Sequence, residues 1–172
     1  MSKIIFETKR LYIREFLFED QTSYSKIIGD YETIKYVLNG KLFLGFKDAK
    51  EAIENFIKAY KEYPGYGYWA IIEKSSNELI GDIGLCPLNE TGESELGYII
   101  REESRGQGIA SEAVKAAILY GFEYLKLNEI VAVCALKNKK SVKLLERAGF
   151  VFQKTGIFHD RESLYFKLSK NR

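Results

Sequence analysis

A short glycine-containing segment, Arg105–Ser111, has the residue types that bind an anion at the start of a helix. Gly106 and Gly108 carry no Cβ atom, so the backbone N–H groups of this turn can converge on one point. Apolar residues then recur at helical spacing over residues 109–125, and the dipole of that helix adds partial positive charge at the turn. The sequence therefore predicts a phosphate-binding site at this turn.

Two common phosphate-binding motifs do not fit the segment. A nucleotide P-loop ends in Gly-Lys-Ser or Gly-Lys-Thr, and residues 105–111 contain no lysine. A dinucleotide fingerprint needs a third glycine where this chain has Ser111, and an acid at the end of the next strand, whereas Glu129 stands at the start of that strand. Neither ligand class is therefore expected.

The remaining pattern, Arg-x-x-Gly-x-Gly/Ala, is formed by Arg105, Gly108 and Ala110. It resembles the pyrophosphate loop of the GNAT superfamily of acyl-coenzyme A N-acyltransferases. Residues 135–150 are similar to the strand end and helix that follow in this family, with its Asn-x-x-Ser and Gly-Phe elements.

The N-terminal Thr8–Arg14 and the strand segment Glu95–Tyr98 look like one branch of this superfamily, the ribosomal-protein N-terminal acetyltransferases of the RimJ/RimL type. That branch often has Trp where this chain has Arg105. The resemblance covers about residues 7–168.

The resemblance implies acetyl-CoA as the co-substrate and assigns residues to its binding. Backbone N–H groups near 99–101 would hold the acetyl carbonyl and the pantetheine arm, and the turn would hold the pyrophosphate. Asn138 would contact the coenzyme, although it is equally well explained as a helix N-cap. The implied coenzyme-binding set is Ile99, Ile100, Arg101, Arg105, Gly106, Gln107, Gly108, Ile109, Ala110, Ser111 and Asn138.

Transfer of an acetyl group from a thioester to an amine by direct attack needs no enzyme nucleophile, and no nucleophile–base pair is recognised in the sequence. Glu95 is the candidate base, against the alternative of a solvent-facing strand residue. The resemblance implies that Ser141 is the acid or a hydrogen-bond donor to the coenzyme sulfur, against the alternative of a first-turn helix serine. Other branches of the superfamily place a tyrosine further along that helix, and residues 142–148 contain none. His159, the one histidine, is expected in a loop before the last strand, with no role assigned.

The pattern of elements predicts an α+β fold with a mixed, mostly antiparallel twisted sheet flanked by helices, in one domain over residues 1–172. Helices are expected over 47–62, 109–125 and 139–148, with shorter pieces near 18–29 and 33–38. Strands are expected over 11–16, 67–73, 78–85, 95–100, 130–134, 151–155 and 164–168, with loops at 87–93 and 156–163. The resemblance further implies that the strands 94–100 and 130–135 splay apart.

The composition, 46% hydrophobic residues and a net charge of +2, favours a globular protein and gives no support for nucleic acid or a membrane as partner. Cys86 and Cys134 indicate neither a disulfide framework nor a metal site, and no metal is expected. With no apolar run of membrane-spanning length and no signal-peptide pattern, we expect a cytoplasmic protein.

The acceptor is left open by the sequence: a peptide or protein N-terminus, a polyamine, an aminoglycoside or another small amine would each be compatible. Monomer and homodimer are both compatible as well. The leading hypothesis is an acetyl-CoA-dependent N-acetyltransferase. The alternatives are a non-catalytic acyl-CoA sensor and an interaction domain that has lost the ligand.

Overall fold

The computed structural model describes residues 2–37 and 46–170. Within these ranges, eight strands form one sheet in the order β1-β2-β3-β4-β5-β6-β8-β7. The strands are β1 (Ile4–Glu7), β2 (Leu11–Arg14), β3 (Gly67–Glu73), β4 (Glu78–Pro87), β5 (Ser94–Ile100), β6 (Glu129–Ala135), β7 (Val151–Phe158) and β8 (Arg161–Ser169). Only the β5–β6 pair is parallel, so the predicted mixed, mostly antiparallel sheet is confirmed for the described residues.

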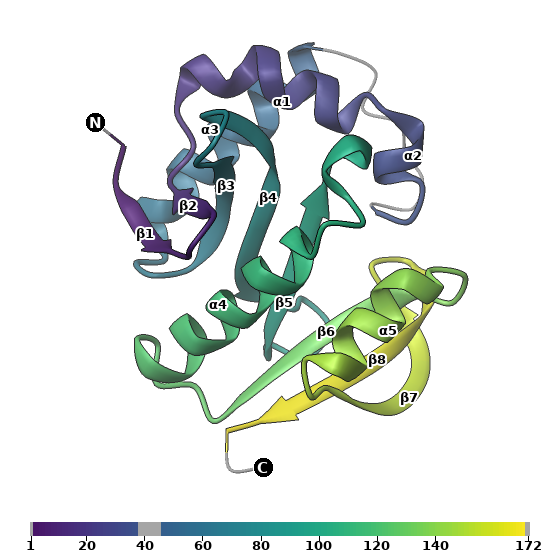
Figure 1. Cartoon of the computed structure of the whole chain (residues 1–172). Coiled ribbons are helices and arrows are strands. Elements are labelled where there is room, and N and C mark those ends of the chain that lie inside the picture. The colour runs from purple at the N-terminus through teal and green to yellow at the C-terminus, as the bar shows by residue number, and fades with distance from the viewer. Residues whose placement is uncertain (1, 38–45, 171–172) are drawn as a thin grey trace.

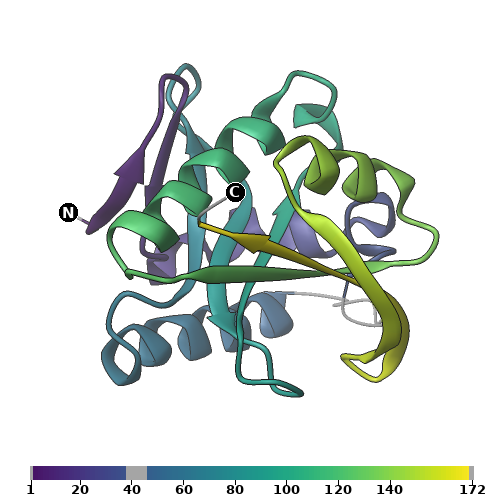
Figure 2. The ribbon, with the colours of Figure 1, turned by 90° about the horizontal axis from the view of Figure 1, so that it is seen from below.

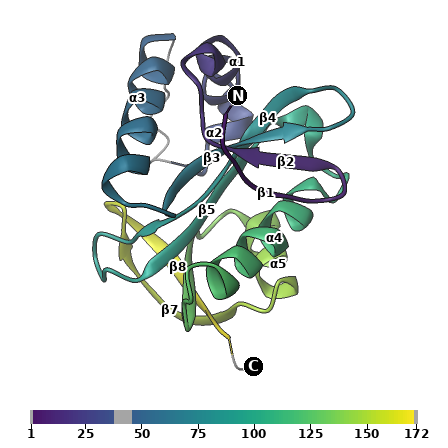
Figure 3. The same ribbon diagram turned by 90° about the vertical axis from the view of Figure 1, so that its left-hand side faces the viewer.

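The helices cover both faces of this sheet. They are α1 (Gln21–Ile28), α2 (Tyr31–Ile34), α3 (Phe46–Glu62), α4 (Ile109–Glu123) and α5 (Lys139–Arg147). Helices α1 to α3 lie on one face, and α4 and α5 lie on the opposite face (Figures 1, 2 and 3). None of the helices in the described part of the chain is both long and apolar enough to cross a membrane.

Each face of the sheet has its own core. On the α4 side, Trp69, Ile83 and Leu85 pack with the apolar stripe of α4 that the spacing of residues 109–125 predicts. On the other side, Tyr24 and Phe56 pack against side chains such as Ile99. Because successive strand residues alternate between faces, β4 and β5 contribute to both cores.

Most predicted elements are present within a few residues of their expected ends. Strand β1 was not expected from the sequence; it is a short edge strand with little buried surface. The helical piece expected at 33–38 is α2, which ends at Ile34, and Leu38 lies outside the described residues.

The prediction of a loop over residues 156–163 is wrong. Strand β7 continues to Phe158 and β8 begins at Arg161, leaving a two-residue turn of His159 and Asp160, both with positive φ. The sequence does not indicate this hairpin, because β7 is an almost fully exposed edge strand without apolar alternation and its turn lacks the usual Asn-Gly pair. Pairing of β8 with the buried strand β6 sets its length instead.

The separation of β5 and β6 is the feature of the sheet that matters most for the site. Their only paired residues are Glu95 and Val131. Beyond that pair the strands diverge, and β6, β8 and β7 turn away from β5 (Figure 1). The implied splay is therefore confirmed.

Glu112, in the first turn of α4, joins this helix to the β1–β2 turn. Its carboxylate accepts hydrogen bonds from the Arg10 backbone N–H at 3.0 Å and from Arg10 Nε at 2.6 Å, and another from the Thr8 hydroxyl. Arg10 Nη1 also donates to the Gln107 carbonyl at 2.8 Å, inside the glycine turn. Burial alone would raise the pKa of Glu112, but these hydrogen bonds and the Arg10 charge outweigh it and lower that pKa.

Glu112→Gln removes the charge and weakens these bonds. We expect the free energy of unfolding at neutral pH to fall by about 1–2 kcal/mol, because hydrogen bonds to charged groups contribute about that much. Since the folded-state pKa is lowered, the wild-type advantage should be full above about pH 5 and should be lost as the pH falls through the folded pKa. Denaturant unfolding across pH measures both effects.

The matched control is Glu123→Gln, at the other end of the same helix. Glu123 forms an exposed ion pair with Lys170 at 3.1 Å, which should contribute less than about 0.5 kcal/mol. Equal losses in the two variants would contradict the role assigned to Glu112.

Candidate active site

The glycine turn has the backbone conformation of an anion-binding site. Gly106 and Gly108 both have φ +77°, which side-chain-bearing residues rarely adopt, and Gly108 is the N-cap of α4. Within the described residues, the N–H groups of residues 106–111 donate to no protein acceptor. These unpaired donors at the start of a fifteen-residue helix fit a phosphate group.

Arg105 is engaged elsewhere. Its Nε donates to the Ile100 carbonyl at 2.9 Å, and its two terminal nitrogens donate to the Glu32 and Thr33 carbonyls at 3.0 and 3.2 Å. The guanidinium thus ties the turn to α2. Binding of phosphate by Arg105 stays a prediction, whereas the contacts that the structure shows support the fold.

Strand β5 presents only alternate backbone groups to the gap beside β6. The Arg101 N–H donates to the Ile80 carbonyl of β4 at 2.9 Å, and Ile99, two residues earlier, pairs with β4 in the same direction. The N–H groups of Ile100 and Tyr98 therefore point toward the gap. Of the three residues predicted to bind through the backbone, only Ile100 has this orientation, and Tyr98 was missed.

A cavity of about 460 Å³ follows this gap. Tyr24 and Phe56, from α1 and α3, line it on one face of the sheet, and Ser141 and Leu145, from α5, line it on the other. Its walls between these ends include residues of both diverging strands, such as Tyr98 of β5. The cavity therefore passes through the sheet, so two ligands could meet in it from opposite faces.

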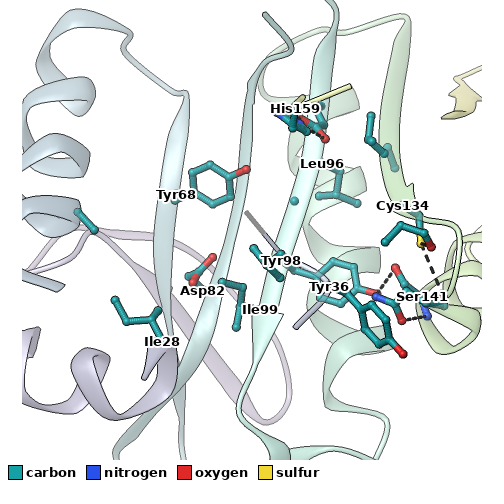
Figure 4. Close-up of a pocket in the computed structure, with 18 of the residues that line it drawn as sticks. Ile28, Tyr36, Tyr68, Asp82, Leu96, Tyr98, Ile99, Cys134, Ser141 and His159 are labelled. Atoms are coloured by element: carbon teal, nitrogen blue, oxygen red, sulfur yellow. Dashed lines mark hydrogen bonds and ion pairs between the residues drawn. The ribbon is translucent and has the colours of Figure 1, made fainter. Parts of the chain in front are cut away.

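At the α5 end, Ser141 meets a tyrosine that the sequence did not suggest. Its Oγ lies 3.0 Å from the hydroxyl of Tyr98, and both side chains line the cavity (Figure 4). Burial raises the pKa of Tyr98, so its phenol stays protonated at neutral pH. Asn138 is a true N-cap, since its Oδ1 accepts the Ser141 N–H at 3.2 Å. Its contact with the coenzyme stays a prediction.

Glu95 is buried, not solvent-facing: only 7% of the residue is exposed. Both carboxylate oxygens lie within hydrogen-bond distance of His159 Nε2, at 3.1 and 2.9 Å. This hydrogen bond with Glu95 raises the pKa of His159, against the effect of its partial burial. The pair sits where β5 and β6 begin to separate, 64 residues apart in the chain.

The two-residue turn between β7 and β8 carries His159 to this position. Its backbone N–H donates to Glu90 Oε1 at 2.6 Å, which ties the turn to the loop between β4 and β5. The next cavity-lining residue, Arg161, has a buried Nε without a hydrogen-bond partner in the described part of the chain. Burial lowers the pKa of Arg161.

Two residues on the α1–α3 face, Asp82 and Tyr68, were missed by sequence reasoning. Asp82 of β4 is 2% exposed and accepts a hydrogen bond from the Tyr24 hydroxyl at 2.9 Å. Tyr68 of β3 lies over Gly84 and Gly97: a Cβ built on Gly97 would be 2.5 Å from the Tyr68 hydroxyl oxygen. The available signal for Asp82 was a charged residue inside an otherwise apolar strand, directly after Gly81 and two residues before Gly84.

Comparison with known proteins identifies the family. Residues 10–151 match the model of the acetyltransferase (GNAT) domain. An uncharacterized N-acetyltransferase of Bacillus licheniformis, p20, is 35% identical over 156 residues, which cover 90% of this chain and 85% of that protein. The ribosomal-protein-serine acetyltransferase of Escherichia coli is 31% identical over 110 residues, 62% of this chain and 59% of that protein.

Among solved structures, a GNAT-family acetyltransferase from Bacillus anthracis superposes with a TM-score of 0.82 at 23% identity, covering 96% of this chain and 98% of that chain. The chain belongs to the GNAT acetyltransferase family and is an acetyl-CoA-dependent N-acetyltransferase. The relatives agree with the RimJ/RimL-like branch that the sequence suggested.

Gly108→Asp and Gly108→Asn form a matched pair that tests the turn. A Cβ at this position meets only Arg10 Nη2, at 3.6 Å, and both variants carry the same strain of a positive φ, about 1 kcal/mol. They differ in charge. We expect calorimetry to detect no acetyl-CoA binding by Gly108→Asp and to detect weakened binding by Gly108→Asn, with folded circular dichroism spectra for both. Undiminished acetyl-CoA affinity in a folded Gly108→Asp protein would contradict the assignment of this turn as the phosphate-binding site.

Proposed function

We propose that this acetyltransferase acts by direct attack of a primary amine on acetyl-CoA, with both substrates in the cavity at once. The observation that carries the proposal is the position of Glu95. It is a buried carboxylate, paired with His159, at the residue where β5 and β6 begin to separate. A group that must take a proton from an amine beside the thioester would occupy this position.

The reaction sets two demands on proton transfer. The acceptor arrives as an ammonium and must lose one proton before its lone pair can form the new N–C bond. The nitrogen loses a second proton as the tetrahedral intermediate collapses, while the C–S bond breaks and the departing thiolate gains a proton. The products are an N-acetyl amine, coenzyme A thiol and one released proton, so the site needs a proton acceptor near the nitrogen and a donor near the sulfur.

Glu95 meets the first demand. It faces the cavity, and its partner His159 has a side chain that is 40% exposed, so the pair reaches from the cavity toward solvent. His159 holds the carboxylate in place, and we infer that it is a positioning residue. Loss of the amine proton to Glu95 then needs no large movement.

Ser141 and Tyr98 meet the second demand. Their hydroxyl groups are hydrogen-bonded on the α5 side of the cavity, opposite the α1–α3 side. The hydroxyl of Ser141 would donate to the thiolate, and Tyr98, whose pKa is raised by burial, would supply or support that proton. Tyr98 thus places a tyrosine hydroxyl beside Ser141, although residues 142–148 of the helix contain no tyrosine.

The acceptor would enter from the α1–α3 side. Asp48 and Glu51 of α3 line that end of the cavity, and their charge favours a cationic amine over a neutral or anionic acceptor. A related protein is named for acetylating a ribosomal-protein serine, so a protein N-terminus is one candidate, beside polyamines and other small amines. A non-catalytic acyl-CoA sensor does not require the pair of Glu95 and His159, because binding without transfer needs no proton acceptor at this position.

Glu95→Gln keeps the size and polarity of the side chain but cannot take a proton. We expect kcat to fall by about 10²–10⁴-fold with acetyl-CoA affinity unchanged. Coenzyme A thiol release with a panel of amines and N-terminal peptides measures kcat, and calorimetry measures the affinity. The control is Glu162→Gln, an exposed carboxylate on β8, which should leave both quantities unchanged.

Other outcomes assign Glu95 differently. If Glu95→Gln raises only the KM of the amine, Glu95 binds the cationic acceptor and is not the base. If neither constant moves, the proton goes to another group or to solvent, and the proposed role is wrong.

A further inference from the structure

Asp82 is a buried acid that faces the cavity without a cationic partner. It lies on the α1–α3 side, and no lysine, arginine or histidine in residues 2–37 and 46–170 forms an ion pair with it. Its Oδ2 accepts the Tyr24 hydroxyl, while its other oxygen has no hydrogen-bond partner among these residues. Burial raises the pKa of Asp82 to about 7, although the Tyr24 hydrogen bond lowers it.

The titratable groups around Asp82 cannot neutralise its charge. They come from α1, α3, β3, β4 and β5, and are Tyr24, Tyr60, Tyr68, Cys86 and Glu95. Burial raises the pKa of each phenol and of the thiol, so they stay neutral at neutral pH, and Glu95 is itself an acid. Because a buried carboxylate is costly without a positive partner, Asp82 is suited to a cationic group brought by a ligand.

Asp82 and Glu95 stand on the same face of the sheet at opposite ends of Tyr68. In the β4–β5 register, Asp82 is opposite Ile99 and Glu95 is opposite Cys86, four residues or about 13 Å further along the strands. The glycine pair between them, Gly84 and Gly97, is covered by the Tyr68 ring. Figure 4 shows Tyr68 between Asp82 and His159, the partner of Glu95.

We propose that the acceptor carries two cationic nitrogens. This inference rests on the proposed function: the reacting amine is bound at Glu95, and a second ammonium that does not react is bound at Asp82. The carbon chain between them crosses the face of Tyr68. Asp82 is thus a specificity-determining residue that selects diamines over monoamines of the same length.

Asp82→Asn tests the inference. The variant keeps the shape of the side chain and an oxygen for the Tyr24 hydroxyl, but removes the charge. We expect kcat/KM for 1,6-diaminohexane, whose extended chain can span the two carboxylates, to fall by about 10- to 100-fold, the effect of losing a hydrogen bond to a charged group. The value for hexylamine should stay unchanged, and the melting temperature should hold or rise because a buried charge is removed.

Glu54→Gln is the control. Glu54 is an exposed carboxylate on α3 that does not line the cavity, and it forms an exposed ion pair with Lys50 at 3.8 Å, so its loss should change the preference for the diamine little. An equal preference for the diamine in wild type and Asp82→Asn would overturn the inference, as would an equal loss for both amines in Asp82→Asn.

Calorimetry on the wild type gives a second measurement, which decides if Asp82→Asn does not fold. A bound ammonium lowers the pKa of a neighbouring carboxylate. With coenzyme A present at pH 7, 1,6-diaminohexane should therefore release more protons on binding than hexylamine, measured in buffers of different ionisation enthalpy. Equal proton release would overturn the inference.

The proposed function and this inference fail in different ways. If the wild type transfers acetyl groups to no amine, the proposed function fails and the inference falls with it. If the wild type acetylates hexylamine as efficiently as 1,6-diaminohexane, the proposed function stands and only the role of Asp82 is refuted.

Discussion

The constraint on which the site depends is the pairing of β5 with β6 at the single residue pair Glu95 and Val131. Beyond that pair, backbone groups of both strands face a gap and lack the partners that a continuous sheet would supply. Tyr98 and Ile100 direct their N–H groups into this gap. A ligand with its own amide groups, such as the pantetheine arm of acetyl-CoA, can pair with such an edge as another strand would. The gap is therefore both a cost to the fold and the basis of binding.

The other parts of the site are positioned around this gap. The glycine turn at the end of β5 offers unpaired N–H groups at the start of α4, and the contacts of Arg10 and Glu112 hold that turn in place. On the α5 side, Asn138 caps the helix that carries Ser141. On the other side, the β7–β8 turn brings His159 to Glu95, where the two strands part. The proposed proton donor for the thiolate thus lies on the α5 side of the sheet, and the proposed base for the amine lies on the α1–α3 side.

Local features of the site could be predicted from the sequence, because their causes are local. The glycine turn follows from two glycines before an apolar stripe, and the cap of α5 follows from Asn138. Features made by distant residues could not be predicted. The Glu95–His159 and Tyr24–Asp82 contacts join residues 64 and 58 positions apart, and two of the three carbonyls that hold Arg105 depend on how α2 packs. The orientation of alternate N–H groups on β5 requires the β4–β5 register, which no single strand reveals.

Both substrates are proposed to meet in a cavity that passes through the sheet. Initial rates, measured while acetyl-CoA and an accepted amine are varied together, test this claim most directly. Attack within a ternary complex predicts double-reciprocal plots that intersect, and no acetylated protein when acetyl-CoA is mixed with the enzyme alone. Parallel plots, together with an acetyl-enzyme that passes its group to the amine at the rate of turnover, would contradict it.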